Sequence, residues 1–217
     1  MTDPGDGAQP MAAAAAGEFG LQDILSDAGD AFKAHFGAVL GAFVVFAIIQ
    51  LVAGKLLILS LFVAPQLMAG FSLILLDALR GGRPPEFKDL FKGFSHYLPL
   101  LVAGLASGLL TGLGLLCLVV PGIVLALMWS QTMFILADDI REVEAGRKPK
   151  AELSGWDAMQ RSAALMSGHK LRFLGYAVVL AIIGAAGTLA AGIGALITVP
   201  FAWLAGAAFY LRLTKLP

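Results

Sequence analysis

The chain has 217 residues, of which 59 % are hydrophobic and only 14 % are charged. Soluble globular domains carry charge on roughly a quarter of their residues, so this composition excludes an ordinary soluble fold and indicates a membrane protein. The formal net charge is zero, so the chain lacks the basic surplus of a nucleic-acid-binding protein. The single cysteine, Cys117, excludes an internal disulfide, a CxxC redox pair and a cysteine-based zinc cluster.

The first twenty residues are rich in Ala, Gly and Pro and include two aspartates. They lack the basic start and the apolar stretch of a secretory signal peptide. This composition predicts a disordered tail over residues 1–20. The remaining residues, 21–217, are predicted to form a single membrane domain.

Two long segments, residues 97–137 and residues 173–211, contain no Asp, Glu, Lys or Arg. A helix needs about 20 apolar residues to cross the hydrocarbon layer, so each segment is long enough for two crossings joined by a short turn. Residues 35–76 form a third such pair, interrupted only by Lys55. The sequence therefore predicts an all-α integral membrane protein with six transmembrane helices in three hairpins. The predicted crossings are residues 36–54, 56–80, 98–120, 121–138, 171–192 and 195–213.

Each hairpin is broken by a short element in which a proline follows valine closely, at Pro65, Pro121 and Pro200. Proline is tolerated in the first turn of a helix, and we therefore expect Pro121 to begin the fourth crossing. Pro65 and Pro200 could begin helices in the same way. A helix that began at Pro200 would be too short to cross before Arg212, so we expect Pro200 to kink a helix that begins near residue 195.

The three hairpins belong to an internal pseudo-threefold repeat, over about residues 21–80, 86–139 and 154–213. In each repeat a short segment with helical periodicity precedes the hairpin, and Ser154 is the expected N-cap of the third segment. The apolar stripes are Leu21, Ile24, Leu25, Ala28 and Phe32; Phe87, Leu90, Phe91, Phe94 and Leu98; and Trp156, Met159, Ala163 and Met166. These segments predict amphipathic interfacial helices on the cytoplasmic surface. Their apolar faces either contact lipid or pack on the protein itself, and periodicity fits both interpretations.

Positive charge collects in residues 80–92, 141–172 and 212–215, whereas the turns near Pro121 and Gly192 carry none. Short basic connections stay on the cytoplasmic side of a membrane. Both termini are therefore expected in the cytoplasm.

Small residues recur four apart in the leading arm of each hairpin. They are Gly37 and Gly41; Gly104, Gly108 and Gly112; and Gly184, Thr188 and Gly192. Small residues let helix backbones approach closely in a membrane. We therefore expect the odd-numbered crossings to form a tightly packed centre.

The three histidines, His35, His96 and His169, occupy matching positions in the repeat. Three imidazoles around a pseudo-threefold axis could hold a zinc ion and leave its fourth position open. No carboxylate is in register with them to orient such ligands, and a polar ring at a membrane boundary is ordinary. We interpret the histidines as interfacial residues and predict no metal and no cofactor.

Few other polar residues occur within the crossings. Asp77 and Arg80 are three residues apart and are expected to pair along one helix face, although Asp77 could instead carry a proton or substrate. Ser130, Gln131 and Thr132 form the most polar spot deep in a crossing. They either line a polar pocket or supply hydrogen bonds between helices.

Five short runs carry a resemblance to a known family: VPGIV at residues 120–124, WS at 129–130, DD at 138–139, AMQRS at 158–162 and GHK at 168–170. The chain resembles the YciC type of bacterial inner-membrane protein and the related membrane domain that other chains carry beside a glycerophosphoryl diester phosphodiesterase. The resemblance implies a six-helix fold in the bacterial inner membrane. It implies no phosphodiesterase activity, because these residues contain no separate soluble catalytic domain. The charged insertion at 140–153 departs from the family pattern.

Nucleophile triads, phosphate-binding loops, paired catalytic carboxylates and dinucleotide fingerprints are absent from the sequence, so we predict a protein that is not an enzyme. The leading hypothesis is a structural or accessory protein whose amphipathic helices contact lipid headgroups or a partner. The expected partners are membrane lipids and either another membrane protein or further copies of this chain, with no nucleic acid. The alternative is a passive channel or a transporter of lipid or small solutes, with a cavity between hairpins near Ser130 and Gln131.

Overall fold

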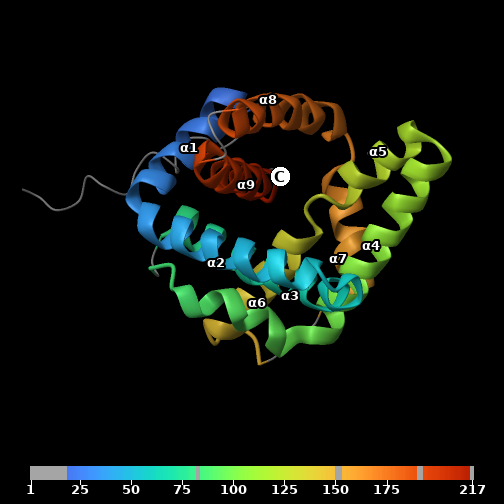
Figure 1. Ribbon diagram of the computed structural model, residues 1–217, viewed down its shortest axis with the longest axis horizontal. Coiled ribbons are helices and arrows are strands. Elements are labelled where there is room, and N and C mark those ends of the chain that lie inside the picture. Colours follow the sequence, from blue (N-terminus) through green and yellow to red (C-terminus); the bar gives the residue numbers. More distant parts are fainter. Residues whose placement is uncertain (1–18, 82–83, 150–152, 190–192, 216–217) are drawn as a thin grey trace, which may run out of the picture.

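The computed structural model describes residues 19–81, 84–149, 153–189 and 193–215, and these residues are helical, with no strand among them (Figure 1). Most of the predicted N-terminal tail, residues 1–18, lies outside the described residues. The helices are α1 (Leu21–Ala34), α2 (Phe36–Gly54), α3 (Leu57–Arg80), the 3₁₀ helix η1 (Phe87–His96), α4 (Tyr97–Cys117), α5 (Val119–Trp129), α6 (Thr132–Glu144), α7 (Gly155–Leu165), α8 (Lys170–Leu189) and α9 (Ile193–Leu213).

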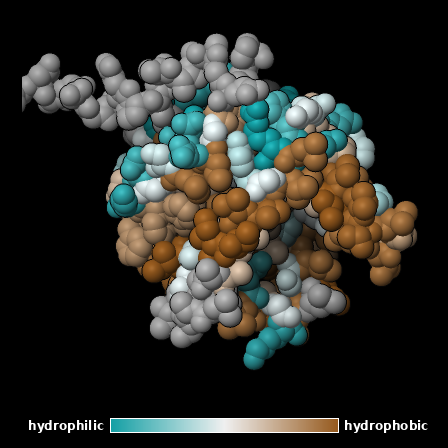
Figure 2. Space-filling view, turned by 90° about the horizontal axis from the view of Figure 1, so that it is seen from above, coloured by the Kyte–Doolittle hydropathy of each residue, from teal (hydrophilic) through white to brown (hydrophobic). Residues whose placement is uncertain are grey.

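Five helical stretches of the described chain are long and apolar enough to cross a membrane: α2, α3, η1 with α4, α5 with α6, and α9. A sixth is added if α7 and α8, which meet at a bend of 96°, count as one span. The prediction of an all-helical fold with several helices that could span a membrane is confirmed. Figure 2 shows brown, apolar side chains over most of one face, beside a band of teal, polar ones.

The observed helices follow the predicted crossings closely, with one exception. α2 has the predicted bounds, and Pro200 lies inside α9, as expected for a kinked helix. Pro65 lies inside α3 and does not begin it. The fourth crossing, predicted over 121–138, lies within one candidate span, Val119–Glu144, but its helix is interrupted, because α5 ends at Trp129 and α6 begins at Thr132.

The packed centre is built on α3 and α9. Helix α3 contacts α2, α4, α6, α9 and η1, and its residues 73–76 are almost fully buried. The α3 and α9 spans are 56 % and 44 % buried, whereas the η1–α4 span is only 11 % buried. The expectation that the odd-numbered crossings form the centre is therefore wrong, because α3 and α9, the second and sixth predicted crossings, are the most deeply buried of the candidate spans.

The three amphipathic segments form short helices, α1, η1 and α7. Each has an aspartate at its third position: Asp23 in α1, Asp89 in η1 and Asp157 in α7. The carboxylate of each aspartate accepts a hydrogen bond from the backbone N–H of the residue three positions earlier. These contacts pair N–H groups that a helix start leaves free. Ser154 is the N-cap of α7, as expected, because its Oγ accepts the N–H of Asp157 at 3.1 Å.

The apolar faces of α1 and α7 pack on the protein. Ile24 and Ala28 of α1 and Met159 of α7 are at most 1 % exposed. The 3₁₀ helix η1 is divided: Leu90 is fully buried, whereas the side chains of Phe87, Phe91 and Phe94 are exposed. Packing on the protein's own surface therefore explains the α1 stripe and part of the α7 stripe, because Trp156 of α7 is 52 % exposed. Helix η1 alone presents a row of aromatic rings outward.

Candidate functional site

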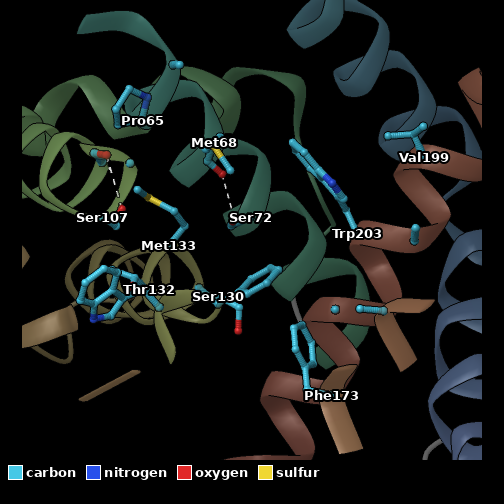
Figure 3. A pocket seen from close by; sticks show the side chains of 18 of the residues that line it. Pro65, Met68, Ser72, Ser107, Ser130, Thr132, Met133, Phe173, Val199 and Trp203 are labelled. Atoms are coloured by element: carbon cyan, nitrogen blue, oxygen red, sulfur yellow. Dashed lines mark hydrogen bonds between the residues drawn. The ribbon is translucent and has the colours of Figure 1, made fainter. Parts of the chain in front are cut away.

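A cavity of about 1110 Å³ lies between α3, α4, the α5–α6 junction, α8 and α9. Its wall is mostly apolar, and no charged residue is among the described residues that line it. Figure 3 shows side chains from these helices converging on the space. The labelled apolar ones are Pro65, Met68, Met133, Phe173, Val199 and Trp203, and the labelled hydroxyl-bearing ones are Ser72, Ser107, Ser130 and Thr132.

Most of these hydroxyl groups donate to their own helix. Ser72 Oγ donates to the carbonyl oxygen of Met68 at 2.7 Å, and Ser107 Oγ donates to that of Ala103 at 2.6 Å. Ser130 Oγ donates to the Leu127 carbonyl oxygen at 2.9 Å. Thr132 differs, because its Oγ1 is buried and has no hydrogen-bond partner.

The α5–α6 break sits in the cavity wall and is held by a side chain from α7. Ser162 Oγ donates to the carbonyl oxygen of Met128 at 2.7 Å and accepts the backbone N–H of Gln131 at 3.2 Å. Ser162 is fully buried. One hydroxyl group therefore pairs a carbonyl from the end of α5 with an N–H from the start of α6. The sequence analysis did not identify Ser162, although it lies in the AMQRS run.

The predicted polar spot at Ser130, Gln131 and Thr132 coincides with this break. Ser130 and Thr132 line the cavity. Gln131 is fully buried and is not part of the lining, and its Nε2 donates to Ser130 Oγ at 3.0 Å. The structure thus divides the three residues between the cavity wall and the packing behind it.

The three predicted histidines lie at three separate corners of the fold. His35 joins α1 to α2, His96 joins η1 to α4, and His169 directly precedes α8. In each case the histidine follows a short helix and precedes a long apolar one. Within the described chain, no group of three His, Cys, Asp or Glu side chains is placed to hold a metal ion.

A layer of ion pairs joins the ends of α3, α6, α9 and α1. Asp77 and Arg80 do not pair with each other, which corrects the sequence-based expectation. Asp77 Oδ1 accepts from Arg141 Nε at 2.6 Å, and Arg80 Nη2 donates to Asp138 Oδ2 at 2.9 Å. The motif Asp-x-x-Arg occurs on both α3 and α6, so the two helices exchange partners reciprocally.

Two further contacts extend this layer to α9 and α1. Tyr210 on α9 donates its hydroxyl to Asp138 Oδ2 at 3.1 Å. Arg212 Nε donates to Asp27 Oδ2 on α1 at 2.8 Å. The first and last described helices are thereby fastened to each other at the same end of the molecule.

The predicted packing glycines are mostly not in close contact within the chain. A Cβ added at Gly104 would lie 2.4 Å from Pro65 Cγ. A Cβ added at Gly37, Gly41, Gly108, Gly112 or Gly184 would meet no atom within 4 Å. The Thr188 side chain and Gly192 lie outside the described residues.

The two closest approaches occur at glycines that the sequence analysis did not select. A Cβ at Gly70 of α3 would lie 2.0 Å from the Leu90 carbonyl oxygen on η1. A Cβ at Gly93 of η1 would lie 2.1 Å from the Gln66 carbonyl oxygen on α3. Both distances are far below any contact that a real Cβ makes, so α3 and η1 cross backbone to backbone.

These features define a multi-helix protein of membrane-compatible character, with an apolar cavity among its long helices. Comparison with known proteins found no matching family model, no matching curated protein and no matching solved structure.

Proposed function

We propose that this protein binds the hydrocarbon chain of a membrane lipid in its cavity and acts without catalysing a reaction, as a passive lipid carrier or lipid-binding component. The observation that carries the proposal is an uncharged, mostly apolar space of about 1110 Å³ among helices that suit a membrane. A water-sized group occupies about 30 Å³, so the cavity has room for on the order of 35 such groups. That number is comparable to the methylene groups of two acyl chains.

The character of the wall supports a lipid over an ion or a polar solute. A pathway for ions needs charged side chains or rows of carbonyl groups. Here the hydroxyl groups of Ser72, Ser107 and Ser130 are paired with nearby backbone carbonyl groups. What the wall offers a guest is dispersion contact with side chains such as Met68, Met133 and Trp203.

We further propose the bacterial inner membrane as the location, with both termini cytoplasmic and six spans in three repeated hairpins. The ion pair between Arg212 and Asp27 supports ends on one side. The repeated order of capped short helix, histidine and long helix supports the threefold repeat. The resemblance to the YciC type of protein is part of this proposal.

A second candidate function, an accessory protein that docks on headgroups or on another membrane protein, is favoured by one observation. Phe87, Phe91 and Phe94 of η1 are 47 %, 44 % and 40 % exposed, and their neighbouring ring centroids are 6.2 and 6.5 Å apart. Such an aromatic row suits the boundary between lipid and water. The accessory function does not require a ligand in the cavity.

The cavity offers a matched pair of variants to test lipid binding. Gly108 lines the cavity and Gly112, one turn further along α4, does not, yet a Cβ at either meets nothing within 4 Å. Purified full-length protein in nanodiscs is irradiated with a phospholipid that carries a diazirine in one acyl chain. We expect crosslinks at Met68 and Met133 that fall in Gly108→Leu and persist in Gly112→Leu. Crosslinks confined to outward-facing residues such as Leu116 would contradict lipid binding in the cavity and favour the accessory role.

A further inference from the structure

The aromatic residues of the cavity wall are not spread evenly along it. Among the described residues, the aromatic side chains that line the space are Trp129, Phe134, Phe173 and Trp203. Phe134 stacks on Tyr210, with ring centroids 5.9 Å apart, and Tyr210 donates to Asp138 in the ion-pair layer. Phe173 lies against Phe209, the residue before Tyr210, at 4.9 Å. Phe134 and Phe173 therefore mark the end of the cavity beside the ion-pair layer.

The opposite end of the cavity is lined by small and aliphatic side chains. On α8 the lining extends from Phe173 to Gly184, a rise of about 16 Å at 1.5 Å per residue. On α9 it extends from Gly206 back to Val199. Residues that line this end include Leu61, Ala64, Leu109, Ala181, Gly184 and Val199. The wall therefore changes along its length, from aromatic beside the ion-pair layer to aliphatic away from it.

A second set of rings packs behind three of the lining rings, two of which, Phe173 and Trp203, are labelled in Figure 3. The partners are Phe209 for Phe173, Tyr210 for Phe134, and both Phe46 and Phe71 for Trp203. None of these partners is among the residues that line the cavity. The lining rings are thus supported from the side away from the space. A ligand meets aromatic surfaces that are already in place, which lowers the cost of ordering them on binding.

The charge of the wall narrows the chemistry of the head that this aromatic end accepts. No charged residue is among the described residues that line the cavity. An ionised headgroup such as a phosphate would lose its hydration here without gaining a cationic partner. A flat ring without charge avoids that cost and gains stacked or edge-to-face contacts with the lining rings.

We propose that the cavity binds an uncharged lipid whose head is a flat conjugated ring, the chemistry of a quinone with a hydrocarbon tail. The ring lies at the aromatic end, beside Phe134 and Phe173, and the tail lies along the small and aliphatic side chains of α8 and α9. This inference rests on the proposed binding of a lipid chain in the cavity, and it names the class of lipid.

The test compares two ligands with the same chain, decylbenzoquinone and decylcyclohexane, whose saturated ring is puckered and has no conjugated face. Each competes with the diazirine phospholipid for crosslinks at Met68 and Met133 of the full-length protein in nanodiscs. The two ligands are compared at equal mole fraction in the bilayer. We expect the quinone to displace the phospholipid from the natural sequence more strongly than decylcyclohexane does.

Variants of the lining rings test where the quinone head binds. Phe173→Leu keeps an apolar side chain but removes a ring, and should reduce the preference for the quinone about two- to tenfold, the ratio that one aromatic contact gives. Phe134→Leu, on a different helix, should have the same effect. Phe62→Leu is the matched control, because Phe62 of α3 is 41 % exposed and does not line the cavity.

Tryptophan fluorescence adds a direct readout, because a bound quinone quenches the emission of a neighbouring indole. Trp129 and Trp203 line the cavity, whereas Trp156 of α7 is exposed and lies outside the lining. In Trp156→Phe we expect quenching that saturates with added quinone and leaves the fluorescence lifetime unchanged. The double variant Trp129→Phe/Trp203→Phe keeps only Trp156 and should show no saturable quenching.

Two kinds of failure are distinguishable. Equal competition by the two ligands, or a quinone preference that neither Phe173→Leu nor Phe134→Leu reduces, would overturn the ring site. Chain binding would remain intact in that case, because the phospholipid would still crosslink to Met68 and Met133. Loss of those crosslinks from the natural sequence itself would overturn chain binding.

Discussion

Helix α3 meets η1 at one place and borders the cavity at another, and glycine has opposite roles in these two regions. At the α3–η1 crossing, Gly70 and Gly93 allow two backbones to touch, with no room for a Cβ at either position. Around the cavity, Gly108 and Gly184 face open space. A small residue therefore marks a close helix crossing in one region and, in the other, leaves volume that a guest can fill.

The packed region also contains the ion pairs, and removing one partner there should have the largest effect. Asp77 is fully buried, and Arg141 is its partner at 2.6 Å. Arg141→Met leaves this carboxylate unpaired, which costs about 3–5 kcal/mol of unfolding free energy. Thermal unfolding of the full chain in mild detergent measures the loss.

Two controls define the interpretation of this first variant. Arg147 pairs with Glu142 on the surface, so Arg147→Met should change stability little. The double variant Asp77→Asn/Arg141→Met removes both charges and should recover most of the lost stability. If Arg141→Met were as stable as Arg147→Met, the Asp77–Arg141 pair would not be a structural link between α3 and α6.

The glycine comparison itself is tested by alanine. Gly70→Ala places a Cβ against a backbone oxygen that cannot rotate away, and overpacking of this kind costs about 1–3 kcal/mol or more. Gly108→Ala meets no atom and should be neutral or stabilising, because alanine favours helix over glycine by roughly 1 kcal/mol. Unfolding midpoints in the same detergent should diverge in opposite directions. Equal unfolding midpoints for Gly70→Ala and Gly108→Ala would contradict the opposite roles of glycine at the α3–η1 crossing and at the cavity.

Sequence reasoning predicted the long helices well because length and apolarity are local properties. The charge-free segments at residues 97–137 and 173–211 contain α4, α5 and most of α8 and α9. Helix α2 ends at Gly54 as predicted, just before Lys55, the only charged residue between positions 35 and 76. For the same reason, the periodic stripes correctly located α1, η1 and α7.

The site was predicted only in part because its parts come together through distant contacts. The polar residues Ser130 and Thr132 were recognised in the sequence. The break at this point depends on Ser162, which bonds to Gln131 across 31 residues. Arg80 and Asp77 each found a partner about sixty positions away, which no i, i+3 rule can anticipate. The spacing of glycines does not tell which helix face meets a neighbour, and a cavity lined by six helices leaves no local signal.

Between the packed region and the cavity, Ser162 holds the α5–α6 break. Ser162→Ala leaves the Met128 carbonyl and the Gln131 N–H without their partner. Stranding these buried groups should cost about 1–3 kcal/mol. Ser95→Ala is the matched control, because its hydroxyl is exposed and its partners, the Lys92 carbonyl oxygen and His96 Nδ1, are both nearby in the chain. Unfolding midpoints that fall equally for the two variants would contradict the clamp.

The smallest effect is expected at the surface, at the start of α7. Hydrogen bonds from the Ser154 hydroxyl and backbone N–H lower the pKa of Asp157 below its ordinary value of 3.8. Because the pKa of Asp157 is lowered in the folded state, its ionised carboxylate stabilises the fold through these hydrogen bonds. This stabilisation is present above the unfolded-state pKa and is lost as the pH falls through the folded-state pKa. Ser154→Ala should therefore unfold at a slightly lower temperature than the natural sequence at pH 7. This difference in unfolding temperature should become smaller below about pH 4. The side chain of Asp157→Asn cannot titrate. The difference in unfolding temperature between Asp157→Asn and the double variant Ser154→Ala/Asp157→Asn should therefore stay the same as the pH is lowered. A gap of the same size at pH 7 and pH 3 would show that the cap acts only through the Asp157 N–H that Ser154 accepts.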